Sequence, residues 1–358
     1  MHSFSARSRR ASFASVAVLG TAVLLAGCAG SADAPDTAGD EAVLSGEIIW
    51  ADFGGPTNEA RQEIYFDPFT ADTGVEVISV VVEDAIQNTM MAGGEGDYDA
   101  THVGLDQVYA NIDNVLEIPE EYQDQELPED IRPYAFGTFF VGHAQGYLTS
   151  TFPDGGPQTW ADFWDVETYP GMRAWPGSPG SYDSTCEIAL LADGVAPDDL
   201  YPLDLDRCTD KLDELRPNIV FYSSYPEIQQ LLVSGSAAIA MGPSGQFAAL
   251  RNAGEDVSVS WDQAIVAPNV IAIPKMAPNP ENILALTEVF HDPELQAEFS
   301  VRTNYGPGNP DAYDHIPADV QDNLVTAPSH DTIVYQDSPW RAENTEALLN
   351  WYTGWLAS

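Results

Sequence analysis

Positive charge is scarce in this sequence. Its 358 residues include 13 Lys and Arg against 56 Asp and Glu, and the formal net charge is −43. Such a chain repels nucleic-acid phosphates and anionic lipid headgroups, which argues against nucleic-acid binding. Neither of its two lysines, Lys211 and Lys275, follows a glycine, so the Gly-Lys-Ser/Thr loop of a P-loop nucleotidase is absent.

The sequence also lacks the residue groups of common enzymes and metal sites. G-H-A-Q-G at 142–146 has the frame of a hydrolase nucleophile elbow, but Ala144 occupies the central position and offers no nucleophile. The six histidines are scattered without an H-x-x-x-H pair, and no G-x-G-x-x-G opens a helix after a strand. We therefore expect no enzymatic activity, no cofactor and no metal.

The N-terminus has the pattern of an export signal. Arg7, Arg9 and Arg10 precede the apolar run 14–26, which is too short to span a bilayer. We expect residues 1–27 to be a signal peptide. Arg9-Arg10 is a weak twin-arginine motif, and the choice between the two export routes stays open.

The end of this signal resembles a lipobox, L-A-G-C at 25–28, in which the cysteine is diacylated and becomes the new N-terminus. We expect lipid on Cys28 and a flexible tether over 28–45, because that segment is small, polar and acidic. The alternative is an ordinary signal peptide with a buried Cys28.

Only two further cysteines occur, Cys186 and Cys208. An exported protein lies in an oxidising compartment, where they can form a disulfide. Such a bridge would close a loop of about 20 residues and stabilise the fold by roughly 3 kcal/mol in the chain-entropy model. Two unpaired buried thiols are the alternative.

The rest of the chain can bury a core in two lobes, since 44% of all residues are hydrophobic and 14 Phe, 15 Tyr and 8 Trp are present. Strand-like and helix-like segments alternate, which favours parallel sheets in an α/β architecture. Helices are expected over 57–70 and 206–216, and S-T-C-E at 184–187 fits a capping box headed by Ser184. Strands are expected at 47–50, 75–82, 100–103, 172–175, 219–222, 237–241, 257–261 and 270–273.

Several short motifs occur in a characteristic order. They include T-W-A-D-F-W-D at 159–165 followed by Y-P-G at 169–171, A-L-L-A-D-G-V at 189–195, L-D-L-D at 203–206, K-L-D-E-L-R-P at 211–217, Q-Q-L-L-V-S-G at 229–235, A-I-P-K at 272–275 and Y-G-P-G-N at 305–309. Over about 46–356, the chain resembles the extracellular solute-binding proteins of ABC importers, of the spermidine/putrescine-binding type.

This resemblance implies an α/β, two-lobed periplasmic-binding-protein fold, each lobe a parallel-rich sheet flanked by helices. Lobe 1 would comprise residues 46–141 plus 269–300, and lobe 2 residues 142–268 plus 301–358. The solute would bind between the lobes at the carboxyl ends of strands, and lobe closure would be sensed by a permease. The expected crossovers lie near 139–146, 267–269 and 301–305.

By the same resemblance, nine residues are expected to contact the solute: Phe53, Gly54, Asp106, Tyr182, Ser244, Gln246, Asn269, Tyr305 and Trp340. Carboxylates pair with ammonium groups, and aromatic rings pack on methylene chains or form cation–π contacts. For Phe53, Tyr182 and Trp340 the alternative is a packing role, and for Ser244 it is a helix cap. Trp351, Tyr352 and Trp355 have helical spacing, and we expect them in the core.

Some positions depart from the polyamine-binding pattern. Where that family has Trp-x-Asp before its late strand signature, this chain has A-P-N at 267–269. Of the acids expected before the Cys186 helix only Asp183 is left, and no aromatic residue stands near 242–244. Arg341, beside Trp340, lies near a family pocket position and would repel a polycation.

The acid excess has two possible explanations, attraction of a cationic solute or adaptation to concentrated salt. The acids are spread over the whole chain and lysine is depleted, which favours salt adaptation, because steering needs only a local patch.

The sequence therefore predicts a lipid-anchored receptor of an ABC importer for a polyamine-like or other small amino compound. A second hypothesis is the same fold binding an anionic or zwitterionic solute, as Arg341 and Asn269 suggest. A third, a secreted lipoprotein hydrolase, is disfavoured by Ala144. The expected partners are the solute, an ABC permease and its ATPase, with a monomer held by its lipid alone on the outer face of the cytoplasmic membrane.

Overall fold

Runs of β-branched and aromatic residues form the strands. The computed structural model describes residues 44–82, 84–94, 97–179 and 184–358. Its strands are β1 (Glu47–Asp52), β2 (Glu76–Val81), β3 (Ala100–Gly104), β4 (Phe136–Leu148), β5 (Arg173–Pro176), β6 (Ile219–Tyr222), β7 (Ile239–Pro243), β8 (Val257–Ala272), β9 (Gly306–Pro307) and β10 (Val334–Tyr335).

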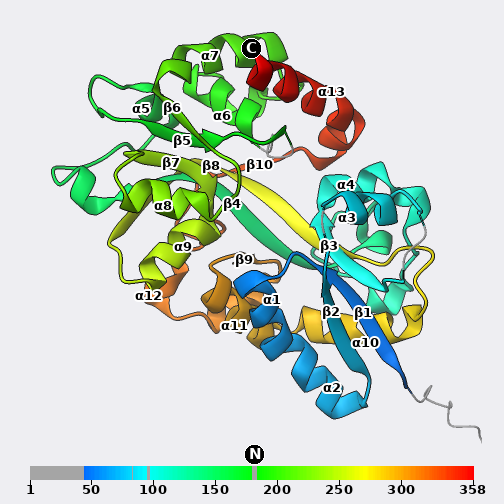
Figure 1. Cartoon of the computed structure of the whole chain (residues 1–358). Helices are drawn as coiled ribbons and strands as arrows, with labels where there is room; N and C mark the ends of the chain where they lie inside the picture. Colours follow the sequence, from blue (N-terminus) through cyan, green and yellow to red (C-terminus); the bar gives the residue numbers. More distant parts are fainter. Residues whose placement is uncertain (1–43, 83, 95–96, 180–183) are drawn as a thin grey trace, which may run out of the picture. The chain divides into compact units, whose positions relative to one another are not determined.

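Two sets of parallel strands are joined by two long antiparallel ones. We call β2, β1 and β3 the β1 group, and β6, β5 and β7 the β5 group; strands that pair within each group are parallel. The strand order is β2-β1-β3-β8-β4-β7-β5-β6. Strand β8 pairs with β3, β4 pairs with β7, and β4 and β8 pair with each other (Figure 1). The expected parallel-rich α/β arrangement is confirmed.

Strand β8 differs from the sequence-based expectation. The segments 257–261 and 270–273 were expected to form separate strands, but β8 runs without a break from Val257 to Ala272. The prediction was wrong because the residues between the two segments, 262–269, also belong to the strand. In the structure, Gln263 takes a positive φ of 53° where the register of β4 against β8 shifts, and the strand continues beyond this irregularity.

Two of the expected crossovers lie on the long strands, because 139–146 is part of β4 and 267–269 part of β8. The third, near 301–305, begins in the last turn of helix α11 (Pro293–Thr303). Asn304 then takes the left-handed conformation that ends this helix, and the chain continues into β9.

The helices begin and end at residues that the sequence marks. Thr159 and Asp162 form a capping box, Asp204, Asp292 and Asp337 cap helices, and Gly74 ends α2 in the left-handed region. The helices are α1 (Gly55–Arg61), a π segment (Gln62–Phe66), α2 (Asp67–Thr73), α3 (Asp84–Met91), α4 (Leu105–Ala110), α5 (Trp160–Trp164), α6 (Thr185–Ala192), α7 (Leu205–Leu215), α8 (Glu227–Val233), α9 (Ser244–Asn252), α10 (Pro280–His291), α11 (Pro293–Thr303), α12 (Ala318–Gln321) and α13 (Ser338–Ala357).

Each strand group has its own hydrophobic core. Trp50 and Phe66 pack with Phe290 of α10 and Phe299 of α11 beside the β1 group. Beside the β5 group, helices α5, α6 and α7 pack with the C-terminal half of α13. Tyr352 and Trp355 are buried there and Trp351 is half-buried, which confirms the expected core role of this stripe.

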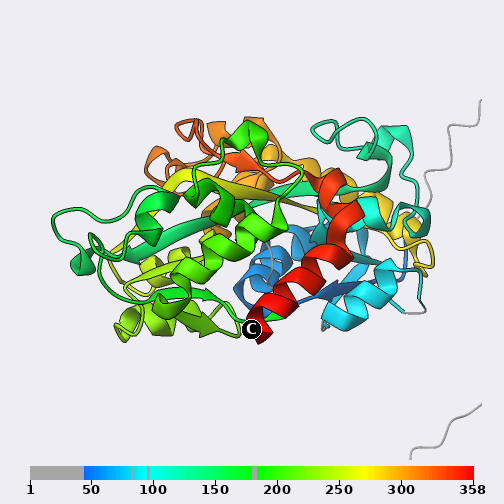
Figure 2. The ribbon, with the colours of Figure 1, turned by 90° about the horizontal axis from the view of Figure 1, so that it is seen from above.

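Helix α13 touches both halves of the molecule. Its residues Leu348, Tyr352 and Trp355 belong to the core beside the β5 group. Its N-terminal part lies against α4, which directly follows β3 of the β1 group (Figures 1 and 2). Among the described residues, every helix is too short or too polar to cross a membrane.

Candidate functional site

A buried carboxylate organises the chain where β1 ends. Asp52, the last residue of β1, accepts hydrogen bonds from Trp50 Nε1 at 3.1 Å, from Gly54 N at 2.9 Å and from Arg61 Nη1. Gly54 has φ +75°, and a Cβ there would lie 3.1 Å from Cγ2 of Val81 in β2. Glycine therefore fits this turn both in conformation and in space.

Aromatic rings extend from this turn to the end of α11. Phe53 is 40% exposed, and its ring lies edge-on to that of His102 in β3 at 5.3 Å. His102 packs on Phe139 of β4 at 6.0 Å, and Phe139 packs on Tyr305 at 5.5 Å. Asn269 of β8 lies in register with both Gly104 and Phe139. The structure thus links three predicted site residues, Phe53, Asn269 and Tyr305, through neighbouring side chains and strands.

We call Asp52, Phe53, Arg61, His102, Phe139 and Tyr305 the first group. Burial and Arg61 determine which of its side chains are charged. Burial alone would raise the pKa of Asp52, but Arg61, together with the hydrogen bond from the Gly54 amide, outweighs burial and lowers that pKa below its usual value. Burial, assisted by Arg61, lowers the pKa of His102 to about 3, and Asp52 opposes this shift only in part. His102 is therefore neutral at physiological pH, while Asp52 is charged.

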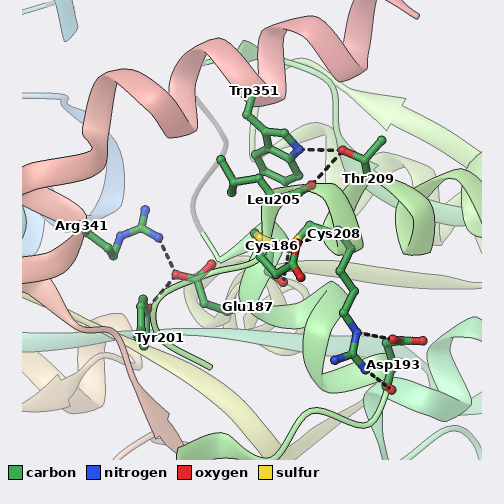
Figure 3. The surroundings of a disulfide bond; sticks show 11 residues. Cys186, Glu187, Asp193, Tyr201, Leu205, Cys208, Thr209, Arg341 and Trp351 are labelled. Atoms are coloured by element: carbon green, nitrogen blue, oxygen red, sulfur yellow. Dashed lines mark hydrogen bonds and ion pairs between the residues drawn. A yellow bond between two sulfur atoms is a disulfide. The ribbon is translucent and has the colours of Figure 1, made fainter. Parts of the chain in front are cut away.

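A second group of charges lies beside α6. Arg341 of α13 donates from Nη1 to Glu187 Oε1 at 2.5 Å, and both side chains are 1% exposed (Figure 3). The Tyr201 hydroxyl donates to the same oxygen at 2.8 Å, and Arg341 Nε lies 3.8 Å from Asp106 Oδ2 in α4. A guanidinium of α13 therefore contacts one acid beside each strand group.

Ser184 does not cap α6, which corrects the sequence-based expectation. It stands at the N-cap position in the left-handed conformation, with φ 59°, so its side chain is turned away from the first helical amides. Its hydroxyl instead lies 2.8 Å from His143 Nδ1 and accepts a hydrogen bond from Gln336 at 3.0 Å. Burial, assisted by Arg341, lowers the pKa of His143 to about 4, against the opposing effect of Glu187.

The predicted residues of α9 have local partners. Ser244, the first residue of α9, is buried and donates to the carbonyl of Asn304 at 3.4 Å. This bond connects α9 with the segment that carries Tyr305, whose hydroxyl lies 3.3 Å from a Cβ built on Gly245. Gln246 accepts a hydrogen bond from Gln229 at 2.8 Å. Ser244 thus lies close to the first group, and its alternative role as a helix cap is wrong because Pro243 is the N-cap residue.

The remaining predicted residues divide into two sets. Asp106 is 18% exposed in the first turn of α4, beside Arg341, and Trp340 packs on Tyr201 with ring centroids 5.3 Å apart. Both therefore belong to the second group. Tyr182 and the predicted lipid-bearing Cys28 lie outside the described residues.

Four important residues were missed at the level of sequence: Arg61, His102, Glu187 and Tyr201. Arg61 lies in a helix within the resembling region, and with so few basic residues an arginine inside a helix with buried apolar neighbours could have been noticed. Glu187 was assigned to a capping box, a local role that hid its bond to Arg341, 154 residues away.

The disulfide prediction is confirmed. Cys186 in α6 and Cys208 in α7 are bonded and both are buried (Figure 3). The bridge directly precedes Glu187, so it fixes the backbone that carries this acid. Within the part of the chain that the structure describes, no three His, Cys, Asp or Glu side chains gather as a metal site would require.

The chemistry of these groups suits binding. Aromatic faces, a half-buried carboxylate and a guanidinium can hold an amine, an alkyl chain and a carboxylate. The frame at 142–146 lies within β4, where an extended backbone replaces the strand-to-helix turn of a nucleophile elbow.

Known proteins resemble this chain in sequence and in fold. The family described as "Bacterial extracellular solute-binding protein" matches residues 65–327. The Gamma-aminobutyric acid-binding protein of Pseudomonas aeruginosa is 30% identical over 322 residues, covering 85% of this chain and 89% of that protein. The Putrescine-binding periplasmic protein SpuD of P. aeruginosa is 24% identical over 323 residues, covering 81% and 84%.

A solved structure agrees with these matches. The Atu4243-GABA receptor superposes with a TM-score of 0.76 at 26% identity, covering 87% of this chain and 98% of that one. The two-lobed α/β fold and the absence of an enzymatic role in the family agree with the sequence-based expectation. This chain belongs to the bacterial extracellular solute-binding proteins.

Proposed function

We propose that this protein captures a small amino compound outside the cell and delivers it unchanged to the permease of an ABC importer. The observation that carries the proposal is the 30% identity to a γ-aminobutyrate-binding protein over most of both chains. Putrescine, the ligand in the name of the second relative, also carries an amine on a short methylene chain. Phe53 and Tyr305 supply aromatic surface for such a chain, and Asp106 can accept from an ammonium group.

The second candidate is a zwitterionic or anionic solute. Arg341 Nε lies 3.8 Å from Asp106 Oδ2 and the Arg341 side chain is 1% exposed, so a solute that opened this contact would meet a cation for its carboxylate and an anion for its amine. The neutral Asn269 stands where the polyamine pattern has an acid, which weakens the hold on a dication. An ω-amino acid would use both charges, whereas a polyamine would be repelled by Arg341.

Delivery would involve closure of two lobes with the boundaries 46–141 plus 269–300 and 142–268 plus 301–358. The continuous strands β4 and β8 link the β1 group to the β5 group, and bending of these two strands would let the halves move. Lipid on Cys28 would hold the monomeric receptor on the outer face of the cytoplasmic membrane, near the permease and its ATPase.

Isothermal titration calorimetry tests this proposal with γ-aminobutyrate, putrescine, succinate and glucose. Binding of γ-aminobutyrate or putrescine with a Kd in the micromolar range or below is expected. A preference for γ-aminobutyrate over putrescine supports the zwitterion, and the reverse supports a polyamine. Binding of succinate alone would contradict the amino compound and support the anionic solute of the second candidate. Binding of glucose alone, or conversion of any probe into a product, would contradict both candidates.

The anchor is tested separately, by mass spectrometry of the protein purified from bacterial membranes. We expect an N-terminal Cys28 with added lipid mass, and release of a Cys28→Ala variant into the soluble fraction. An unmodified cysteine in a membrane-bound protein would contradict the anchor.

A further inference from the structure

Arg61 is a buried cation beneath the first group of candidate residues. Its side chain is 1% exposed, and its Nη1 donates to Asp52 Oδ2. The guanidinium carbon lies 5.5 Å from the ring centre of Trp50 and 5.7 Å from that of Phe299. One side chain of α1 therefore contacts residues of β1 and α11.

Both contacts lead to predicted solute-binding residues. Asp52 accepts the amide hydrogen of Gly54, so the Asp52–Arg61 pair holds the turn that presents Phe53. Phe299 lies in α11 and packs on Phe139 with centroids 5.9 Å apart. Phe139 in turn packs on Tyr305. Arg61 is thus connected to Phe53 through Asp52, and to Tyr305 through Phe299 and Phe139.

Arg61 cannot itself hold a solute in this arrangement. The cavity beside it, lined by Gln296, Ser300 and Phe299 among others, has a volume of about 10 Å³. That is room for about one water molecule and far too little for an amino acid or a diamine. Any effect of Arg61 on binding must therefore pass through the residues that it holds in place.

We propose that Arg61 is a positioning residue for solute binding. Its charge keeps Asp52 ionised inside the protein, and the ionised carboxylate fixes the Phe53–Gly54 turn through the Gly54 amide. This inference rests on the proposed function for its effect on affinity, but not for its effect on the turn.

The first test needs no solute. Amide hydrogen exchange at Gly54 is measured in the wild type, in Arg61→Met and in Arg61→Lys. We expect exchange at least tenfold faster in Arg61→Met and a smaller acceleration in Arg61→Lys, which keeps the charge but loses the planar fork. Should Arg61→Met fail to fold, Arg61→Lys and Asp52→Asn give the same comparison. Unchanged exchange at Gly54 in the folded variants would overturn the proposal.

Arg173 provides a matched control. It is also fully buried, lies 6.0 Å from the Phe163 ring and donates to backbone carbonyls, but it belongs to β5. We expect Arg173→Met to lower stability while leaving exchange at Gly54 within twofold of the wild type. Equal acceleration in both methionine variants would reduce Arg61 to a general stabilising residue and overturn the proposal.

The second test measures affinity for γ-aminobutyrate and putrescine in Phe53→Ala, Arg61→Met and the double variant, under conditions where all are folded. We expect Arg61→Met to raise Kd at least tenfold, and the double variant to be no more than twofold weaker than Phe53→Ala. If the rise in Kd of the double variant equalled the product of the two single rises, Arg61 would not act through Phe53 and the proposal would be contradicted. If the wild type binds neither probe, the proposed function fails, while the exchange result still decides whether Arg61 holds the turn.

Discussion

Two buried acid–arginine pairs of this protein differ in how they are built. Asp52 and Arg61 are nine residues apart, and Asp52 also accepts from Trp50 and Gly54, so its oxygens are well supplied with donors. Glu187 and Arg341 are 154 residues apart, and only Oε1 of Glu187 has donors among the described residues. The first pair is a local support, and the second joins α13 to α6.

The two pairs therefore stabilise different parts of the molecule. The Asp52–Arg61 pair lies below an exposed aromatic residue and stays within the β1 group and its helices. The Glu187–Arg341 pair also lies 3.8 Å from Asp106, so it contacts the opposite half of the molecule. We expect damage to the first pair to act on one turn, and damage to the second to act on the position of α13.

The largest effect is expected from removing one cation at a time. A buried carboxylate without its partner costs roughly 3–5 kcal/mol. The loss of unfolding free energy in Arg341→Met should lie at the upper end of this range, because Glu187 then keeps only one donor, Tyr201. The loss in Arg61→Met should be smaller, because Asp52 keeps two donors, Trp50 and Gly54. Urea denaturation measures both free energies of unfolding.

Two controls sharpen that comparison. Arg302 forms an exposed ion pair with Glu63, and the two side chains are 54% and 60% exposed, respectively. Arg302→Met should therefore lower the free energy of unfolding by less than about 1 kcal/mol. Glu187→Gln combined with Arg341→Met should be more stable than Arg341→Met alone, because no buried charge is left unpaired. Equal losses at exposed and buried arginines would contradict the comparison.

Sequence reasoning recovers the local pattern better than the distant contacts. The parallel strands, the helix ending near Gly74 and the Cys186–Cys208 bridge follow from periodicity, capping residues and cysteine number. The capping role of Ser184 was wrong because S-x-x-E is a local pattern, while the bonds to His143 and Gln336 depend on tertiary packing. No local pattern could place Arg341 beside Glu187.

Removal of the disulfide should lower stability somewhat less, and it should affect only the Glu187–Arg341 pair. Cys186→Ser with Cys208→Ser opens a covalent link between residues 22 apart and should lower the free energy of unfolding by roughly 3 kcal/mol. Because Cys186 precedes Glu187, hydrogen exchange around Glu187 should accelerate. Exchange at Gly54, beside the other pair, should not change, and acceleration there would show that the two pairs are not independent.

Each of the two pairs has a neighbouring histidine that makes stability depend on pH. The pKa of His143, near Arg341 and Glu187, is lowered to about 4 from the ordinary 6.5, and that of His102, near Asp52, to about 3. The unfolded chain therefore binds protons below pH 6.5 that the folded chain does not, and stability falls as the pH is lowered from 6.5 to 4. Each histidine contributes a slope of about 1.4 kcal/mol per pH unit.

The histidine slopes are measured by urea denaturation at several pH values. Between pH 4.5 and 6, His143→Gln and His102→Gln should each reduce the slope of the unfolding free energy against pH by about 1.4 kcal/mol per pH unit. This reduction is expected whatever the substitution does to absolute stability. An unchanged slope in either variant would mean that the histidine titrates normally in the folded protein.

Salt should give the smallest effect, and it contrasts buried with exposed charge. Arg61, Arg173 and Arg341 are buried, so the surface has even fewer cations than the composition suggests. Potassium chloride between 0.1 and 3 M should raise Tm by a few degrees by screening acid repulsion. A flat response would rule out salt adaptation and leave solute steering as the explanation of the acid excess.

The candidate site itself is only partly readable from sequence. Phe53, Asn269 and Tyr305 were predicted because they occupy positions of a family pattern, and the structure links them through His102 and Phe139. Arg61 lies outside that pattern, since it is buried and acts through Asp52. A supporting residue of this kind is visible only once the side chains around it are placed.

The most direct test of the account is a crystal structure of the protein grown with γ-aminobutyrate. We expect the intact solute to contact Phe53 or Tyr305 on one side and Asp106 or Arg341 on the other, with the Asp52–Arg61 pair unchanged below it. A solute bound away from both groups, or a site that holds only a reaction product, would contradict the account.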